Sequence, residues 1–236
     1  MKNIKKIVKF FLKFFGYDRD RRRILNRYCD MLPYDFKTII DAGANVGQFS
    51  REMIAAFPQA QIYAFEPIAN CFDKLKKISN RDNFKAMPYA LGNQNGETKI
   101  NVSSYSPSSS LLKMSGLHKR IFPHTAGEHQ ETIQIRRLDD VVKDLDVRMP
   151  LLLKMDVQGY EKEVILGGPE TFKKASVVFS ETSFVPLYEG QPLTGEIAEV
   201  LGKIGFDYKG SLSQKKNPQT GEVVSEDSVF VKQVNI

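Results

Sequence analysis

Residue types that crosslink a chain or bind soft metals are scarce in this sequence. Its 236 residues include two cysteines, three histidines and no tryptophan. Cys29 and Cys71 have neither the spacing of a zinc site nor the number that a disulfide framework needs. This scarcity argues against a disulfide- or zinc-stabilised scaffold and favours a reducing compartment, so we expect a cytoplasmic protein.

Long apolar runs are also missing. No stretch reaches the roughly 18 consecutive apolar residues that a membrane-spanning helix needs. No small-residue cleavage site follows the N-terminal apolar residues, so a secretory signal peptide is not indicated. With 42% hydrophobic and 26% charged residues, the chain has a globular composition, and its length suits one α/β domain. We find no internal repeat and no second domain.

The first 36 residues form a segment of their own, which precedes a domain predicted over residues 37–236. Within residues 1–16, lysines share one arc of a helical wheel and apolar residues cover the rest, which predicts a basic amphipathic helix. The lysines are Lys2, Lys5, Lys6, Lys9 and Lys13. Such a helix either packs on the core with its lysines in water or lies on an anionic membrane surface. The net charge of +6 permits an anionic partner without requiring one, and we expect no nucleic acid.

Strand and helix patterns alternate from residue 37 onward. Strands are predicted at 37–41, 61–65, 84–90, 151–155 and 176–180, and helices at 47–57, 70–78, 159–174 and 195–204. This alternation predicts a parallel sheet covered by helices on both faces. Two final strands, 206–212 and 228–234, are joined by a predicted loop and indicate an antiparallel hairpin. We therefore expect a Rossmann-like, mostly parallel, seven-stranded sheet.

The alternation breaks between residues 93 and 137. Residues 97–102 and 132–136 are predicted to be extra strands, and a serine-rich stretch and all three histidines lie between them. A long insertion with little regular pattern is usually a functional or a mobile loop.

Residues 38–49 carry the most informative pattern. A β-branched apolar run ends at Asp41, and Gly43 and Gly47 follow before a helical pattern begins. Asn45 stands where a dinucleotide motif has its second glycine, which lets the backbone approach the pyrophosphate. S-adenosylmethionine has no phosphate. We expect Asp41 to act on its amino end, directly or through water, and Gly43 and Asn45 to line its methionine part. Gly47 is also expected to belong to the cofactor site. The alternative is a plain strand–turn–helix joint.

Glu66 and Pro67 follow the second predicted strand. A carboxylate at this place can accept hydrogen bonds from both ribose hydroxyls, and proline ends the strand. NAD sites also bind the ribose through a carboxylate at this place, so Glu66 indicates a ligand that contains adenosine. The alternative is that Glu66 is only a solvated acid at the end of a strand. Ala90 and Leu91, at the end of the third strand, are expected to flank the adenine.

Two acidic residues are expected at neighbouring strand ends. Asp156 follows the strand 151–155, and Glu181 follows the next strand. The carboxyl ends of such strands form the ligand crevice of an open α/β sheet. These two carboxylates can serve as a general base with an orienting partner. They can equally hold Mg²⁺, which prefers oxygen ligands; two carboxylates alone do not establish a metal site.

Side chains in the insertion and after the fifth strand are candidates for contacting an acceptor. Ser109, Ser110 and Tyr188 are suited to a polyhydroxyl molecule, although the serines also fit a flexible loop. The histidines are alternative general bases, or ordinary loop residues: His118, His124 and His129.

Several of these strings together resemble the FkbM family of S-adenosylmethionine-dependent methyltransferases. They are IIDAGANVGQFS (39–50), FEP (65–67), ALGNQNGE (90–97), SSSLL (108–112), RLDDVV (137–142), LLKMDVQGYEKEVILGG (152–168) and SETSFVPLYEGQP (180–192). The resemblance implies a class I methyltransferase fold and O-methylation of a sugar, glycan or natural-product hydroxyl. An NAD-linked oxidoreductase and a non-catalytic, membrane-associated cofactor-binding protein are the alternatives.

Overall fold

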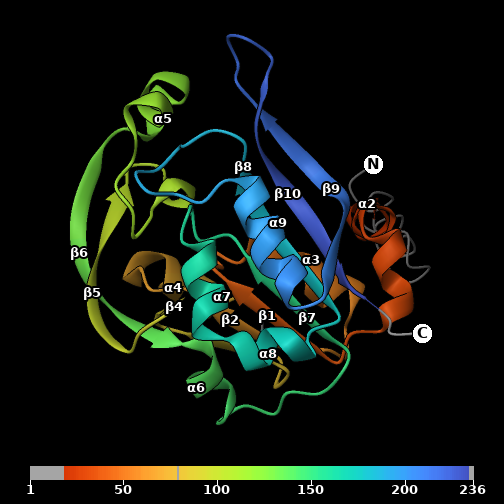
Figure 1. The fold of residues 1–236 in the computed structure, drawn as a ribbon. Helices are drawn as coiled ribbons and strands as arrows, with labels where there is room; N and C mark the ends of the chain where they lie inside the picture. Colours follow the sequence, from red (N-terminus) through yellow and green to blue (C-terminus); the bar gives the residue numbers. More distant parts are fainter. Residues whose placement is uncertain (1–18, 79, 234–236) are drawn as a thin grey trace, which may run out of the picture.

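A seven-stranded sheet forms the centre of the computed structural model, which describes residues 19–78 and 80–233 (Figure 1). The strand order is β3-β2-β1-β7-β8-β10-β9. The strands are β1 (Thr38–Ala42), β2 (Gln61–Phe65), β3 (Phe84–Met87), β7 (Leu151–Met155), β8 (Val177–Ser183), β9 (Phe206–Lys216) and β10 (Val223–Lys232). β10 runs antiparallel to β8 and β9, and the other neighbours are parallel. This arrangement confirms the predicted Rossmann-like class.

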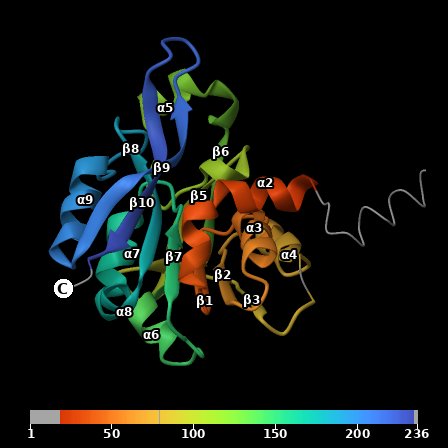
Figure 2. The same ribbon diagram turned by 90° about the vertical axis from the view of Figure 1, so that its right-hand side faces the viewer.

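Helices cover both faces of this sheet (Figure 2). One face packs against α2 (Arg19–Arg27), η1 (Cys29–Tyr34), α3 (Gln48–Ala56) and α4 (Ala69–Leu75). The other face packs against α6 (Leu138–Val142), α7 (Glu161–Gly167), α8 (Pro169–Lys174) and α9 (Thr194–Lys203). Successive side chains point to opposite faces of a strand, so Ile39 and Ile40 of β1 are both buried, each in a different core. A strand buried on both faces needs the continuous apolar run that the sequence has.

The sheet order reverses between β1 and β7. From β1 the chain builds outward through β2 and β3, and it later returns to place β7 on the opposite side of β1. At such a switch point the connections leave in opposite directions, and a crevice opens beyond the carboxyl ends of the strands. The candidate residues that follow β1, β2 and β7 therefore converge with Glu181, which lies within β8 near its carboxyl end.

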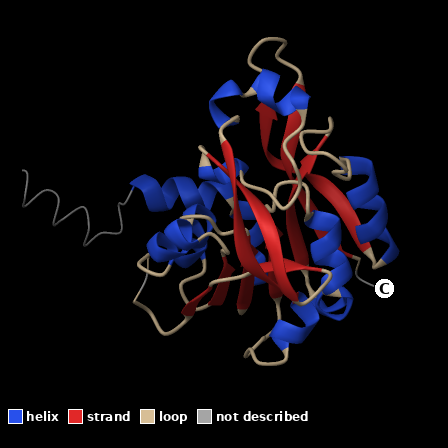
Figure 3. Ribbon diagram, turned by 90° about the vertical axis from the view of Figure 1, so that its left-hand side faces the viewer, coloured by secondary structure: helices blue, strands red, loops and turns tan. Residues whose placement is uncertain are grey.

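The insertion forms a second, three-stranded sheet beside the first, whose strands cross in front of the main sheet in Figure 3. It contains β4 (Ala90–Gly92), β5 (Gly96–Ser103) and β6 (Glu128–Arg137), in the order β4-β6-β5. The two extra strands predicted in this region are confirmed with longer bounds. The segment between them contains η2 (Ser106–Ser108), α5 (Gly116–Ile121) and η3 (Pro123–Thr125).

Two predicted elements are each divided in the structure. The strand predicted at 84–90 ends at Met87, and Ala90 begins β4 in the small sheet. Pro88 lies between them and has no N–H for the ladder. The helix predicted at 159–174 is α7 followed by α8, because Pro169 cannot continue the hydrogen bonds of a helix.

The loop predicted at 213–227 was largely wrong. β9 and β10 remain paired as far as Lys216 and Val223, so only residues 217–222 turn. Main-chain hydrogen bonds hold this part of the hairpin, which projects beyond the sheet (Figure 1). On β9 the side chains of residues 213–216 are exposed, so the apolar pattern that marks a buried strand is absent there, whereas Val224, Ser225 and Glu226 of β10 are buried.

The segments near the two chain ends were covered only in part by the predictions. α2 and η1 lie within the predicted segment 1–36. The predicted amphipathic helix 1–16 lies outside the described residues, as does position 234 of the last predicted strand. Within residues 19–78 and 80–233, no helix has the length and apolar character needed to cross a membrane.

The close contact between α7 and β4 predicts a sharp stability effect. A Cβ on Gly167 would lie 1.8 Å from the carbonyl oxygen of Gly92, so Gly167→Ala forces a backbone shift. We expect its unfolding free energy to fall by about 1–3 kcal/mol. Gly202→Ala is the control, since a Cβ there meets no heavy atom within 4 Å and alanine favours the helix by about 0.5–1 kcal/mol. Equal urea midpoints for Gly167→Ala and the wild type would contradict the contact.

Candidate active site

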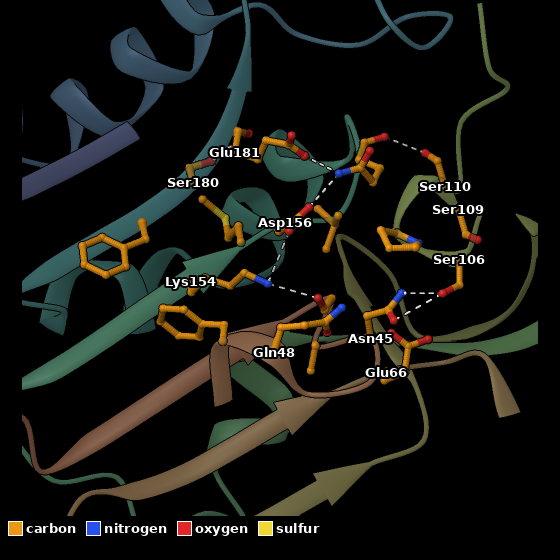
Figure 4. Close-up of a pocket in the computed structure, with 18 of the residues that line it drawn as sticks. Asn45, Gln48, Glu66, Ser106, Ser109, Ser110, Lys154, Asp156, Ser180 and Glu181 are labelled. Atoms are coloured by element: carbon orange, nitrogen blue, oxygen red, sulfur yellow. Dashed lines mark hydrogen bonds and ion pairs between the residues drawn. The ribbon is translucent and has the colours of Figure 1, made fainter. Parts of the chain in front are cut away.

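One cavity of about 340 Å³ opens at the carboxyl ends of β1, β2, β7 and β8 (Figure 4). Ten of the residues predicted from sequence line it: Gly43, Asn45, Glu66, Pro67, Ala90, Leu91, Ser109, Ser110, Asp156 and Glu181. Asp41, Gly47 and Tyr188 are not among the lining residues. The fold therefore brings most of the predicted cofactor and catalytic positions to one place.

The turn after β1 packs directly on the end of β7. Gly43 has a φ of +74°, and a Cβ there would lie 2.0 Å from the carbonyl oxygen of Asp156. Only glycine permits both the conformation and the approach. Asn45 also has a positive φ, and its side-chain amide pairs with Ser106 Oγ at 3.2 Å. Gly47 has a structural position instead, because a Cβ would meet the Ile78 side chain at 2.7 Å.

Glu66 is a nearly buried carboxylate that faces the cavity. Its two oxygens accept hydrogen bonds from the backbone N–H groups of Asn45, at 2.9 Å, and Ile68, at 2.8 Å. Burial raises the pKa of Glu66 to about 7, although these two donors oppose the shift. Each carboxylate oxygen has further lone pairs, so Glu66 can still accept the hydroxyl hydrogens of a ribose.

Lys154 connects the turn to the end of β7. Its Nζ lies 3.0 Å from Asp41 Oδ1, 3.0 Å from the Gly43 carbonyl oxygen and 3.7 Å from Asp156 Oδ2. Burial lowers the pKa of Lys154, but the two carboxylates outweigh this effect and the net shift is upward. The lysine therefore stays charged beside the cavity.

The position of Asp41 does not fit the expected direct contact with a ligand. Its side chain is fully buried, and its second oxygen accepts a hydrogen bond from Ser50 Oγ at 2.7 Å. Asp41 lies within β1, where strand alternation directs it to the α3 face and not into the crevice. The residue contacts the cavity wall through Lys154.

Asp156 and Glu181 lie together, as the sequence suggested, and share a partner. The side-chain nitrogen of Gln158 donates to Asp156 Oδ1 at 2.7 Å and also to Glu181 Oε2. Lys215 Nζ lies 3.3 Å from Glu181 Oε1. Burial and the neighbouring Asp156 charge raise the pKa of Glu181 to about 7. Burial also acts on Asp156, but Lys154 and Gln158 outweigh it and hold the pKa of Asp156 below its usual value.

The donor set does not fit a magnesium ion. In the described part of the chain, no group of three or more His, Cys, Asp or Glu residues is placed to hold a metal. The Gln158 NH₂ group lies where an ion shared by both carboxylates would bind, and Mg²⁺ requires an octahedron of oxygen atoms. No step considered below involves a metal.

The side chains expected to contact an acceptor are largely engaged within the protein. Tyr188 is buried, and its hydroxyl lies 2.8 Å from Gln158 Oε1 and 3.0 Å from the Ser108 carbonyl oxygen. Ser110 Oγ donates to the Gln158 carbonyl oxygen at 2.6 Å, and Ser109 Oγ accepts from a backbone N–H. A role for the two serines in binding an acceptor stays a prediction.

The three histidines do not line this cavity. His118 is buried in α5 against the rings of Phe122 and Tyr188. Burial lowers the pKa of His118 to about 4. Their positions give no support to a histidine base.

Comparison with known families agrees with this geometry. A profile described as the Methyltransferase FkbM domain matches residues 41–208, well over half of the chain. The chain belongs to the FkbM methyltransferase family. The matched region spans the glycine turn, Glu66 and both carboxylates, so the resemblance seen in the sequence is confirmed.

Several named proteins are similar to this FkbM methyltransferase. It is 30% identical over 174 residues to the 2-O-methyltransferase NoeI of Sinorhizobium fredii, covering 69% of this chain and 70% of that protein. It is 29% identical over 143 residues to the hexuronic acid methyltransferase AglP of Haloferax volcanii, and that match covers 60% of this chain and 54% of AglP. The crystal structure of Methyltransferase FkbM from Methylobacillus flagellatus superposes with a TM-score of 0.53 at 12% identity. That match covers 84% of this chain and 44% of the other, and it concerns the fold alone.

Sequence reasoning missed several residues of the FkbM-type cavity. Gln158 follows Asp156 by two residues, and a sequence signal for it existed in the string KMDVQGYE. Lys154 lies near the end of β7, and nothing in the sequence indicates its partners. Tyr28, Phe49 and Phe179 form an aromatic wall with ring centroids 6.1–6.4 Å apart. Tyr28 directly precedes η1, Phe49 lies in α3 and Phe179 lies in β8. No local sequence pattern indicates that positions so far apart in the chain come together.

Proposed function

We propose that this FkbM methyltransferase transfers a methyl group from S-adenosylmethionine to a hydroxyl oxygen of a sugar-like or natural-product acceptor. The observation that carries the proposal is that one cavity is lined both by Glu66 and by the pair Asp156–Glu181. Glu66 suits the binding of a ribose, and the pair Asp156–Glu181 suits the deprotonation of a hydroxyl group. Both lie at the switch point of the sheet, where α/β proteins bind ligands.

The charge of the cavity supports S-adenosylmethionine over a dinucleotide. Carboxylates outnumber cations among the lining residues, with Glu52, Glu66, Asp156, Glu181 and Asp227 against Arg27 and Lys154. A pyrophosphate would be repelled by such a lining, whereas a sulfonium and an ammonium would be attracted. Asn45 at the position of the second glycine also argues against NAD. Ala90 and Leu91 supply an apolar surface for adenine.

The chemistry follows from the different states of the two carboxylates. When bound, the cofactor supplies a methyl group on a sulfonium that is already a good leaving group, so positioning dominates the reaction. Glu181, whose pKa is about 7, can accept the hydroxyl proton while the acceptor oxygen bonds to the methyl carbon and the carbon–sulfur bond breaks. Asp156 stays ionised beside Lys154 and orients the hydroxyl. Deprotonation by a base with such a pKa is effective at neutral pH.

The class of acceptor is inferred from the relatives. The name of NoeI specifies 2-O-methylation, and that of AglP specifies a hexuronic acid. A sugar hydroxyl, free or within a glycan, is therefore the acceptor that we propose to test first.

Cofactor binding gives the first test. Calorimetry should detect S-adenosylhomocysteine binding and no NAD binding. Glu66→Gln should weaken that binding about tenfold or more, because hydrogen bonds to a charged group contribute about 1.5–3 kcal/mol. Glu97→Gln is the matched control, since Glu97 is exposed on β5 and its carboxylate accepts a hydrogen bond from Gln134 across the small sheet, away from the cavity. Binding of NAD without S-adenosylhomocysteine would overturn the cofactor assignment.

Turnover gives the second test. Labelled S-adenosylmethionine is incubated with a cell extract split into glycan, lipid and small-molecule fractions, with and without EDTA. With the acceptor identified in this way, kcat should rise by about tenfold per pH unit below pH 7 and level off above about pH 7. The reason is that Glu181 must be ionised to accept the hydroxyl proton. Glu181→Gln should abolish this pH-dependent limb and Asp156→Asn should lower kcat, both with cofactor affinity retained. Full turnover in both variants would refute these roles.

We also propose that residues 1–16 bring the enzyme to an anionic membrane surface. The exposed arginines of α2 continue the basic character of that segment: Arg19, Arg21, Arg22 and Arg23. Vesicles of phosphatidylcholine with phosphatidylserine should bind the protein in co-sedimentation, more weakly at higher salt. Pure phosphatidylcholine is the control. Binding that persists unchanged after deletion of residues 1–16 would exclude this role.

A further inference from the structure

We infer that Gln158 is a positioning residue, whose side-chain amide holds Asp156 and Glu181 in the arrangement that deprotonates the acceptor. This inference rests on the proposed function, because it assigns a task to a residue that supports those two carboxylates. Four observations carry it: the backbone of Gln158, its side-chain contacts, the anchor behind it and its link to the cavity wall.

The backbone of Gln158 adopts an unfavourable conformation. Its φ is +54°, in the left-handed region, where a residue other than glycine loses about 1–2 kcal/mol. Gly159, with a φ of +96°, completes the turn between β7 and α7. This turn directs the Gln158 side chain back over the end of β7, toward Asp156. Backbone strain of this kind is retained where the surrounding structure and function require it.

The side-chain nitrogen of Gln158 is shared between the two carboxylates. It donates to Asp156 Oδ1 at 2.7 Å and to Glu181 Oε2 (Figure 4). An amide NH₂ group has two hydrogens, so one nitrogen can serve both acceptors. One nitrogen atom therefore bridges an acid that follows β7 and an acid within β8. Each acid also has a cation of its own, Lys154 beside Asp156 and Lys215 beside Glu181.

Tyr188 determines which end of the amide faces the carboxylates. Its hydroxyl lies 2.8 Å from Gln158 Oε1 and can donate to it, which leaves the NH₂ group for the acids. Tyr188 is only 1% exposed, so water does not compete for this bond. The reversed amide would place its oxygen against two carboxylates and lose the tyrosine donor. The buried hydroxyl thus fixes the donor orientation.

The main chain of Gln158 is linked to the wall of the cavity. Its carbonyl oxygen accepts a hydrogen bond from Ser110 Oγ at 2.6 Å. The Tyr188 hydroxyl also lies 3.0 Å from the Ser108 carbonyl oxygen. The segment that carries η2, which borders the cofactor side through Ser106 and Asn45, is therefore attached to the residue that orients the acids.

The test compares amide-removing variants inside and outside this network. Gln158→Leu removes both hydrogen bonds to the acids, and Gln158→Met does so at nearly the original length. Tyr188→Phe keeps the Gln158 amide and removes the hydroxyl that contacts Gln158 Oε1 and the Ser108 carbonyl oxygen. Asn83→Leu is the matched control. The Asn83 side-chain nitrogen bridges the carbonyl oxygens of Pro58 and Ala60, at 3.1 and 2.8 Å, and Asn83 is not among the residues that line the cavity.

The first readout needs neither acceptor nor turnover. In protein labelled with ¹⁵N-glutamine, the NH₂ signal of Gln158 is assigned by its loss in Gln158→Leu. We expect this signal to shift in Asp156→Asn, Glu181→Gln and Tyr188→Phe, and to stay in place in Asn83→Leu. An NH₂ signal that is unmoved by both acid substitutions would overturn the inference.

The second readout separates positioning from folding. In Gln158→Leu and Gln158→Met, kcat should fall about tenfold or more, as expected for loss of hydrogen bonds to charged groups. The KM for the acceptor and the affinity for S-adenosylhomocysteine should change by less than about threefold. Tyr188→Phe should give a smaller loss in kcat, and Asn83→Leu should lower the thermal midpoint and leave kcat unchanged.

The outcomes distinguish this inference from the proposed function. Wild-type kcat in a folded Gln158→Met or Gln158→Leu protein would refute it, even if the methyltransferase activity is established. If the wild type binds no S-adenosylhomocysteine, the proposed function fails, and the NMR shifts still report on the contacts of Gln158. If Gln158→Leu does not fold, Gln158→Met and Tyr188→Phe supply both readouts.

Discussion

The ammonium group of Lys154 is the interaction on which the geometry of the site depends. It is nearly enclosed, with 12% of the side chain exposed, and it contacts Asp41, the Gly43 carbonyl and Asp156. Removing this charge would leave the fully buried Asp41 carboxylate without its cation, which costs several kcal/mol in a protein interior. The lysine also joins the turn after β1 to the end of β7. Those two segments contribute the backbone beside the cavity and one of the acids, so Lys154 adds a side-chain link to the main-chain pairing of β1 with β7.

This ion pair explains why neighbouring carboxylates behave differently. Asp41 is compensated by Lys154 and has a structural role. Asp156 shares the same cation, which keeps its pKa low. Glu181 is farther along the sheet, is more affected by burial, and has the Asp156 charge as a neighbour, which raises its pKa to about 7. Lys215 lies 3.3 Å from Glu181 and opposes this rise, but burial and the Asp156 charge outweigh it. The balance of burial, like charge and nearby cations thus separates an ionised acid from one that can exchange a proton at neutral pH.

The donor side and the acceptor side of the cavity are built from different parts of the fold. The ends of β1 and β2 belong to the main sheet and supply Gly43, Asn45 and Glu66. The remaining walls come from the insertion, from the segment around α2, and from the β9–β10 hairpin, which contribute Tyr105, Tyr28 and Leu212. Walls on insertions and hairpins can vary without disturbing the central sheet.

Much of this protein was predictable from its sequence, because those features depend on local patterns. Apolar runs ending in Asp41, Phe65 and Met155 indicated buried parallel strands, and Glu66, Asp156 and Glu181 were found from their places at strand ends. The division of the helix at Pro169 had a local signal, because proline has no N–H for a helical hydrogen bond, but the prediction did not use it. The long hairpin around Lys216 had no such signal on β9, since main-chain pairing with β10 defines that strand there. The same limit applies to side-chain partners. That Asp41 points away from the cavity, that Tyr188 lies behind Gln158, and that one amide serves two acids are decided only when distant strands meet. Periodicity along a chain records which face of an element is buried, whereas a hydrogen-bond network depends on distances across elements, which only the tertiary structure sets.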